Sequence, residues 1–393
     1  MMLKIVPTKQ VRLGMFIHEL QGPWLEHPFL KSAFILNDPS DLKKLQASAV
    51  SAVVIDTSKG LDVDGVEAPT EMTTSSIIKT KAKLSFARLE RERARQVIAK
   101  SKLTVTTMFD EVRMGKAVCA ATALQVVDDI AVALAHNAGA LISLVRLKHK
   151  DDYTYMHSLA VCVLMQVLAK QIGLPNDKIR QVGLAGLLHD IGKTGIDKEV
   201  LNKPGALTEG ELTLVKLHPE RGHALLLEAN ITDEVVLEVC LYHHEKTNGL
   251  GYPHQLKADD ISVFAKMGAV CDVYDAITSN RPYKKGWQPG FALQQMAQWE
   301  GHFDDRVFRA FVKSVGIYPV SSVVALSSGR VAVVVEQSAQ SLLKPVVKVF
   351  FSTLSNSSLP VQVVHLATES DAIVGHVQPE DYPMHDIEQI ISQ

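Results

Sequence analysis

The sequence is poor in cysteine and contains no C-x-x-C pair. Its four cysteines, Cys119, Cys162, Cys240 and Cys271, are far apart along 393 residues. This spacing argues against a zinc knuckle or a dithiol redox motif. Three of the four lie in apolar stretches, where we expect them to be small buried hydrophobic side chains. Such cysteine usage suits a reducing cytosol.

Long apolar segments and an excess of one charge are also missing. Residues 1–11 carry no apolar stretch typical of a signal peptide, and runs such as residues 159–165 are far shorter than a membrane span. The formal net charge is -2, so duplex nucleic acid is not an expected partner, although a local basic patch could hold a small anion. We therefore expect a globular cytoplasmic protein without a membrane span.

The composition and hydrophobic patterning of the sequence change several times along the first half. Residues 1–60 combine short apolar runs, turn signals and one helix-start signal, and predict a small α+β domain. Residues 61–77 are acidic and then rich in Thr and Ser, as is typical of a linker. Residues 78–149 contain no proline and predict a helical connector. Its helix pair could present a solvated charged face or form the seam of a homodimer.

The second half divides into two further regions. Residues 150–315 have apolar side chains at helical spacing and predict a second helical domain. Residues 316–393 contain several Val-rich runs separated by turn signals, and predict a small β-rich C-terminal module with a short helix at 386–391. The predicted fold class is mainly α.

Histidines and aspartates gather in the second helical domain. A lone histidine on a helix is usually a core or surface residue, so each residue alone says little. Together, five imidazoles and two carboxylates exceed the needs of one ion and fit two adjacent ions with open positions for water. Such sites cleave phosphate esters. The residues are His157, His189, Asp190, His218, His243, His244 and Asp272.

Residues 153–315 resemble the HD-GYP family, a branch of the HD phosphohydrolase superfamily. The resemblance covers a little under half of the chain and implies an HD-type helical bundle. It rests on blocks in the family's order and approximate intervals: His157-Ser158, His189-Asp190-Ile191-Gly192-Lys193, Leu201-Asn202-Lys203-Pro204-Gly205, His218-Pro219, His243-His244-Glu245, Gly249-Leu250-Gly251-Tyr252-Pro253, Asp272-Val273-Tyr274-Asp275-Ala276-Ile277-Thr278-Ser279 and Arg281-Pro282-Tyr283.

The resemblance implies a metal-dependent phosphodiesterase for cyclic di-GMP or 3′3′-cyclic GMP-AMP. A hydroxide that bridges two ions would attack the phosphorus and release the linear dinucleotide. Asp190 would be catalytic as the bridge between the ions. Iron or manganese is most common in the family, and nickel, cobalt or zinc also suit such ligands. The implied metal ligands are His157, His189, Asp190, His218, His243, His244 and Asp272.

Three basic residues and one loop complete the implied site. Lys193 would be catalytic near the phosphate or the attacking water; alternatively, it is a helix-end lysine that pairs with carbonyls. Arg281 and Lys284 would bind the substrate phosphate, or be ordinary solvated charges. The loop from Gly249 to Pro253 is linked in the family to GGDEF-type synthases, which would be partners.

The sequence departs from the family pattern at two positions. Asn248 stands where the family usually has aspartate; asparagine permits the same turn but removes a negative charge. Tyr153 stands where some relatives have a glutamate that holds a third metal. Tyrosine is a poor ligand at neutral pH, so we expect two ions and a linear product.

The N-terminal residues resemble an uncharacterised domain found before some bacterial HD-GYP modules. The matching blocks are Met15-Phe16-Ile17, Gly22-Pro23-Trp24, His27-Pro28-Phe29 and Val54-Ile55-Asp56. Trp24, His27 and Phe29 could form a ligand surface or pack a small domain.

Two alternatives to the cyclic dinucleotide phosphodiesterase remain. The first is a receptor that binds the dinucleotide without turnover and signals through the helices of residues 78–145. The intact ligand set argues against it. The second is a generic HD phosphohydrolase acting on nucleotides, which the block from Gly249 to Pro253 disfavours.

Overall fold

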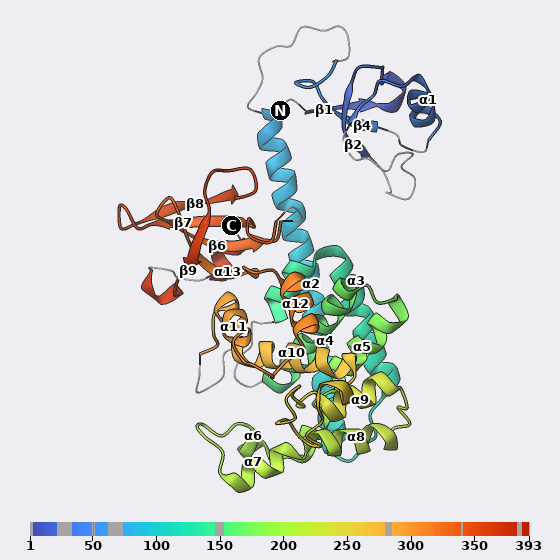
Figure 1. Ribbon diagram of the computed structural model, residues 1–393, viewed down its shortest axis with the longest axis vertical. Coiled ribbons are helices and arrows are strands. Elements are labelled where there is room, and N and C mark those ends of the chain that lie inside the picture. The colour runs from blue at the N-terminus through green and yellow to red at the C-terminus, as the bar shows by residue number, and fades with distance from the viewer. Residues whose placement is uncertain are drawn as a thin grey trace. The chain divides into compact units, whose positions relative to one another are not determined.

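The computed structural model describes residues 3–21, 34–48, 50, 52–61, 74–145, 153–279, 285–338, 341–382 and 387–392. The chain forms two compact units, Met1–Lys79 and Thr80–Gln393. The first contains a small sheet, and the second contains a body of helices and a second sheet (Figure 1). The expected fold class, mainly α with two small regions containing strands, is confirmed.

The N-terminal unit is an antiparallel sheet with one helix. Its strands β1 (Leu3–Pro7), β2 (Phe16–Gln21), β3 (Phe34–Ile35) and β4 (Ala52–Asp56) pair in the order β1-β4-β2-β3. A 3-10 turn, η1 (Thr8–Gln10), follows β1. Helix α1 (Pro39–Ala47) begins where the Asp38 side chain accepts a hydrogen bond from the Ser40 amide. Trp24, His27 and Phe29 lie outside the described residues.

Two long helices follow. Helix α2 (Thr74–Arg113) is 40 residues long, and a short turn separates it from α3 (Ala120–Val145). The backbone of Asn137 leaves the helical region inside α3, and its side chain accepts a hydrogen bond from the Ala140 amide. Side chains of α3 and of the C-terminal half of α2 belong to the same hydrophobic core as the helices that follow.

Those helices form the body that carries the candidate site. The α-helices are α4 (Tyr153–Ile172), α5 (Asn176–Leu188), α6 (Lys198–Leu201), α7 (Glu209–Lys216), α8 (His218–Glu228), α9 (Glu234–Tyr242), α10 (Val263–Thr278), α11 (Pro289–Met296) and α12 (Asp305–Val315). Two 3-10 turns, η4 (Ile191–Gly195) and η5 (Ala258–Asp260), lie between them.

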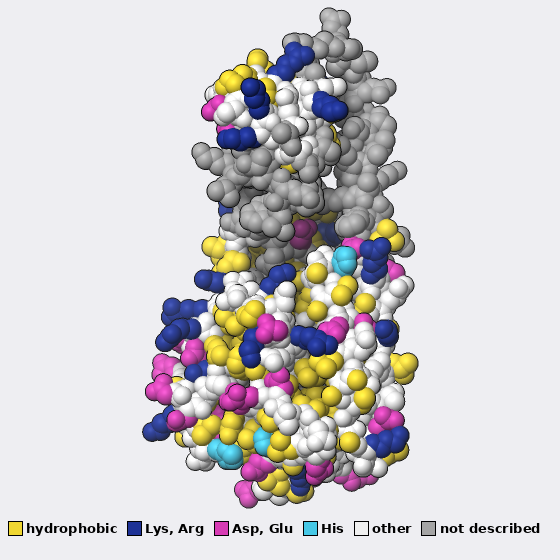
Figure 2. Space-filling view, turned by 90° about the vertical axis from the view of Figure 1, so that its right-hand side faces the viewer, with side chains coloured by type: hydrophobic (Ala, Val, Ile, Leu, Met, Phe, Trp, Pro, Cys, Tyr) yellow, Lys and Arg dark blue, Asp and Glu magenta, His cyan; other side chains and the backbone are white. Residues whose placement is uncertain are grey.

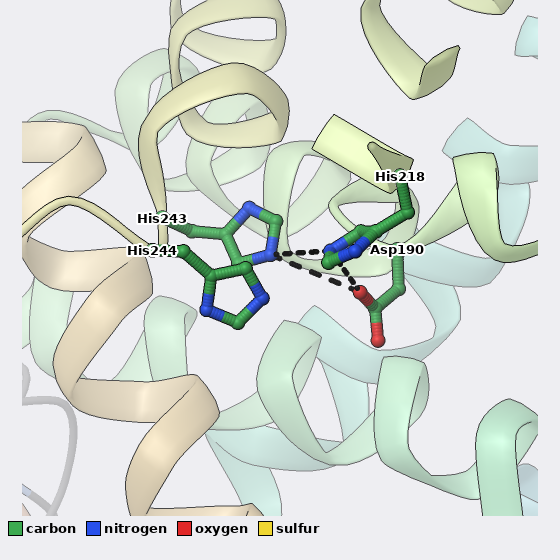
Figure 3. Close-up of side chains that lie close together, drawn as sticks. All are labelled: Asp190, His218, His243 and His244. Atoms are coloured by element: carbon green, nitrogen blue, oxygen red, sulfur yellow. Dashed lines mark hydrogen bonds and ion pairs between the residues drawn. The ribbon is translucent and has the colours of Figure 1, made fainter. Parts of the chain in front are cut away.

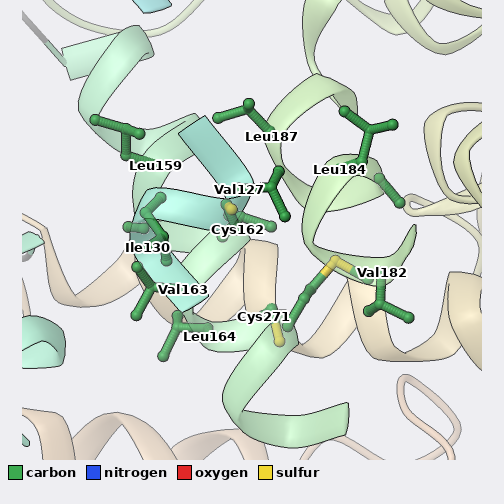
Figure 4. Close-up of a cluster of buried hydrophobic side chains, with 14 of the residues drawn as sticks. Val127, Ile130, Leu159, Cys162, Val163, Leu164, Val182, Leu184, Leu187 and Cys271 are labelled. Atoms are coloured by element: carbon green, nitrogen blue, oxygen red, sulfur yellow. The ribbon is translucent and has the colours of Figure 1, made fainter. Parts of the chain in front are cut away.

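Helix α4 is the centre of this body, since it contacts α3, α5, α10 and α12. Figure 4 shows part of the core, where side chains of α4 such as Leu159 and Cys162 gather with Ile130 of α3, Leu187 of α5 and Cys271 of α10. Cys162, Cys240 and Cys271 are buried free thiols and Cys119 is an exposed one.

By length and composition alone, two described helices could cross a membrane, Ala120–Val145 and Thr154–Ile172. Most of the second is buried inside the helical body, as expected of a core helix.

The C-terminal sheet is antiparallel, with strands in the order β8-β7-β6-β5-β9. They are β5 (Val323–Leu326), β6 (Arg330–Glu336), β7 (Val346–Ser352), β8 (Ser357–His365) and β9 (Ile373–His376), followed by η6 (Pro379–Asp381) and α13 (Ile387–Ser392). Both faces of the sheet are apolar, and Ile390 of α13 packs on the face formed by Val331 and Phe351.

Candidate metal centre

The seven candidate ligands come mainly from the ends of helices. His157 lies in α4 and Asp272 in α10, whereas His189 and Asp190 lie between the end of α5 and the start of η4. His218 is the first residue of α8, a start favoured by Pro219, and His243 and His244 follow the end of α9. Four of the side chains converge in Figure 3.

Gly192 permits the approach of two of these segments. A Cβ atom at this position would lie 2.0 Å from the carbonyl oxygen of His218 and 2.5 Å from the amide of Gly222. Only glycine lets the backbone of η4 lie this close to the start of α8. The glycine of the His189-Asp190-Ile191-Gly192-Lys193 block therefore brings Asp190 next to His218.

The donor atoms form two groups around one carboxylate. Asp190, His218, His243 and His244 each offer an atom within 4.8 Å of the others, and so do His157, His189 and Asp272. Asp190 Oδ1 lies 3.2 Å from His218 Nε2, and Asp190 Oδ2 lies 3.4 Å from His189 Nε2 and 3.5 Å from His157 Nε2. The Asp190 carboxylate thus stands between the two groups.

Hydrogen bonds to backbone carbonyls fix the protonated nitrogen of three imidazoles. A carbonyl oxygen only accepts, so each Nδ1 donates and each Nε2 keeps its lone pair for a cation. The pairs are His189 with Gly186 at 2.8 Å, His218 with Val215 at 2.7 Å and His243 with Val239 at 2.9 Å.

The electrostatics favour neutral imidazoles at His218, His243 and His244 and ionised carboxylates beside them. At His157 burial lowers the pKa, but the carboxylates of Asp272 and Asp275 outweigh it and raise the pKa above the ordinary value. Burial, together with the nearby imidazoles of His189 and His218, lowers the pKa of His243 to about 3, and burial holds the pKa of His244 well below its usual range. Burial opposes ionisation of Asp190, but the Lys193 ammonium and neighbouring imidazoles hold its pKa well below the ordinary value. A set of neutral nitrogens and anionic oxygens is the form that binds metal ions.

Several atoms of the centre lack a partner that a cation would supply. Among the described residues, His189 Nε2 and Asp190 Oδ1 are buried without a hydrogen-bond partner. His218 Nε2 and His243 Nε2 face each other at 3.3 Å, although both carry lone pairs. The residues therefore fit metal ions, and imidazole with carboxylate suits transition metals.

The metal centre opens into a cavity of about 130 Å³. Lys193 is at this opening, with Nζ 2.6 Å from Asp190 Oδ2 and the side chain 21% exposed. The lining side chains are Thr154, His157, Asp190, Lys193, His244, Asp272 and Ala276. A larger cavity of about 330 Å³ lies away from the metal centre, between α2 and α3. Arg281 and Lys284, expected to bind phosphate, lie outside the described residues.

Sequence reasoning gave no role to Asp275 or to Thr154. The buried Asp275 carboxylate lies 2.6 Å from His157 Nδ1, and Thr154 lines the cavity one turn before His157. The sequence spacing could have indicated both residues, because two residues three positions apart on a helix lie on the same face. Asp275 follows Asp272 at that spacing, and Thr154 precedes His157 at the same spacing.

The loop after His244 closes one side of the centre. The Tyr252 ring stacks on the His244 ring, with centroids 4.6 Å apart and an angle of 23°. The buried Glu245 carboxylate holds the loop, since it accepts hydrogen bonds from the amides of His254 and Leu256. Asn248 Oδ1 accepts from the Leu250 amide at 3.0 Å, a turn that aspartate would also support.

Two family models match the chain. Residues 3–123 match "Domain of unknown function (DUF3391)", and residues 133–307 match "HD domain". A Pseudomonas aeruginosa protein named cyclic di-GMP phosphodiesterase is 49% identical over 396 residues, covering 99% of this chain and 95% of that protein.

Two other relatives match a smaller part. A Xanthomonas campestris cyclic di-GMP phosphodiesterase response regulator is 40% identical over 42% of this chain and 45% of its own length. A Vibrio cholerae 3′3′-cGAMP-specific phosphodiesterase is 34% identical over 42% of this chain and 38% of its own length.

Proposed function

We propose a function from the premise that this chain belongs to the HD-GYP branch of the HD domain family. It is a metal-dependent phosphodiesterase that hydrolyses a cyclic dinucleotide second messenger, cyclic di-GMP or 3′3′-cyclic GMP-AMP, to the linear dinucleotide. The observation that carries this proposal is the Asp190 carboxylate, which presents one oxygen to His218 and the other to His157 and His189.

Two transition ions are proposed, with iron or manganese ahead of nickel, cobalt or zinc. Bound ions of this kind lower the pKa of water to near neutrality and polarise a phosphate. Asp190 would be shared between them. His218, His243 and His244 would complete one ligand set, and His157, His189 and Asp272 the other.

The other side chains bind and orient the substrate. The Lys193 ammonium lies at the cavity opening, where it neutralises negative charge that develops on the phosphate. Arg281 and Lys284 are proposed to bind a phosphate of the dinucleotide. Tyr153 in place of a carboxylate supports two ions rather than three, and with them a linear product.

Three finer proposals concern the surroundings of the enzyme. The loop from Gly249 to Pro253 would bind GGDEF-type synthases, and Leu250 at its tip is 75% exposed. Helices α2 and α3 would form a homodimer, since Leu103 and Val132 are exposed apolar side chains there. The free, exposed thiol of Cys119 supports a location in the reducing cytoplasm.

Duplex nucleic acid is not among the proposed partners. On the described part of the face in Figure 2, Lys and Arg side chains are interspersed with Asp and Glu side chains. A mixed surface of this kind does not create the one-sign field that steers a protein to the phosphate backbone.

The test is product analysis on iron- and manganese-loaded protein, with both dinucleotides as substrates. We expect a linear dinucleotide, loss of turnover with a chelator, and loss of turnover in His218→Ala. The matched control is His223→Ala, which removes a histidine of the same helix that is in neither ligand group. Tight binding of both dinucleotides without any linear product would contradict the enzyme and favour a receptor.

A further inference from the structure

The last turn of α2, residues 109–113, contacts the segment that carries His157. The Tyr155 hydroxyl donates a hydrogen bond to Asp110 Oδ1 at 2.9 Å. The Phe109 ring meets the Tyr155 ring edge-on, with centroids 5.8 Å apart. Because Tyr155 lies two residues before His157 in α4, this turn fixes the part of α4 from which His157 reaches the metal centre.

The same turn of α2 also contacts the segment after Asp190. Arg113 Nη1 donates a hydrogen bond to the Ile196 carbonyl at 2.8 Å. Ile196 caps η4, which begins directly after Asp190 and contains Lys193. Asp110 also faces Lys198 Nζ at 3.6 Å, but both side chains are exposed, so this pair contributes little.

The end of α2 that includes this turn, residues 105–113, is held firmly. Val105, Met108, Phe109 and Val112 are at most 5% exposed and belong to the core that contains α4 and α5. A close-packed interior transmits a displacement rather than absorbing it. A shift of α2 would therefore move the His157 segment and the Asp190 segment together or apart.

We infer that Asp110 and Arg113 are positioning residues of the metal centre. They hold α4 and η4 at the spacing that places His157 Nε2 3.5 Å from Asp190 Oδ2. Metal–ligand distances tolerate changes of only about 0.2 Å, so this spacing sets metal affinity. An expected change in turnover rests on the proposed function, whereas an expected change in metal affinity does not.

The experiment titrates metal-free, full-length protein with Mn²⁺ by calorimetry and measures kcat and KM on the loaded enzyme. Asp110→Ala and Arg113→Ala should each weaken Mn²⁺ binding about tenfold, the lower end of outer-sphere effects. They should lower kcat while leaving KM unchanged, and Arg113→Lys should restore most of the loss. Glu111→Ala is the control, because Glu111 is in the same turn but pairs with the exposed Lys116.

Tyr155→Phe removes one hydroxyl and covers the case in which an alanine variant folds poorly. It should weaken Mn²⁺ binding as much as Asp110→Ala does. The double variant Asp110→Ala/Tyr155→Phe should bind Mn²⁺ no more weakly than either single variant. The positioning role would be overturned if Tyr155→Phe and Arg113→Ala bound Mn²⁺ with affinities within about twofold of the Glu111→Ala value. Weakened Mn²⁺ binding in a protein whose wild type cleaves neither dinucleotide would support positioning and refute the proposed function.

Discussion

His157 and Asp275 form a buried pair in which the imidazole Nδ1 lies 2.6 Å from a carboxylate oxygen. The opposite nitrogen, His157 Nε2, is then directed at Asp272 and Asp190, at 3.0 and 3.5 Å. A carboxylate behind a histidine fixes the orientation of the ring and makes it a stronger ligand. Ser279 supports the pair from the other side, since its hydroxyl donates to Asp275 Oδ1.

Asp275→Asn should therefore weaken metal binding without removing a ligand. We expect Mn²⁺ affinity to fall about tenfold to a hundredfold. Calorimetric titration of the metal-free protein measures it, and circular dichroism checks that the helices remain. Ser279→Ala is the matched control and should reduce Mn²⁺ affinity less, because it leaves the Asp275 carboxylate in place. An Asp275→Asn variant with wild-type affinity would show that the pair only supports packing.

Lys193→Met should separate metal binding from catalysis. The side chain lies at the cavity opening and is not in either ligand group, so metal content should stay at the wild-type level. The loss of its charge near the phosphate should lower kcat about a hundredfold. Lys170→Met, at an exposed position of α4, is the control. A variant that keeps its kcat would assign Lys193 to the structural role of neutralising Asp190.

Gly192→Ala should disrupt the approach of η4 to α8. The added methyl group would meet backbone atoms of His218 and Gly222, which cannot move aside as a side chain can. We expect a loss of about 1–3 kcal/mol in the free energy of unfolding, with reduced metal content. Gly195→Ala is the control, since the nearest atom to its Cβ would be Arg221 Cδ at 4.0 Å. Equal melting temperatures for the two variants would contradict the steric argument.

Asp371 makes the C-terminal sheet sensitive to acid. Burial raises the pKa of this carboxyl, but hydrogen bonds from Ser328, Ser327 and Arg330 outweigh it and hold the pKa well below the ordinary 3.8. A lowered folded-state pKa stabilises the fold above the unfolded-state value, and this stability is lost as the pH falls below about 4. Thermal unfolding between pH 3 and pH 7 should therefore show a smaller dependence on pH in Asp371→Asn than in the wild type.

The control for that experiment is Glu369→Gln, which changes an exposed carboxylate close by in the sequence. It should follow the wild-type dependence on pH. If Asp371→Asn followed the wild-type curve as well, the acid sensitivity would come from other groups.

The sequence predicted those parts of the molecule that local signals specify. The Asp38-Pro39 signal starts α1, and the Ser328-Gly329 turn joins β5 to β6. The seven proposed ligands also lie together, but they span residues 157–272, and the resemblance to the HD-GYP family predicted their convergence where local signals could not. Their roles as ligands stay a prediction until an ion is observed.

The rest depended on contacts between segments far apart in the chain. The alternating charges of residues 88–95 are typical of a solvated helix face, yet Glu90 is 3% exposed in the folded protein. Strand β1 is short and mostly exposed, and its pairing with β4, nearly fifty residues away, defines it. The Arg113–Ile196 contact joins residues 83 positions apart, which no local pattern can reveal.

Two ions are proposed to share the Asp190 carboxylate, and anomalous diffraction from crystals of manganese-loaded protein would locate them. We expect two peaks about 3.5–4 Å apart, each adjacent to one of the two oxygens of Asp190. A single peak, a third peak near Tyr153, or peaks away from Asp190 would contradict this proposal.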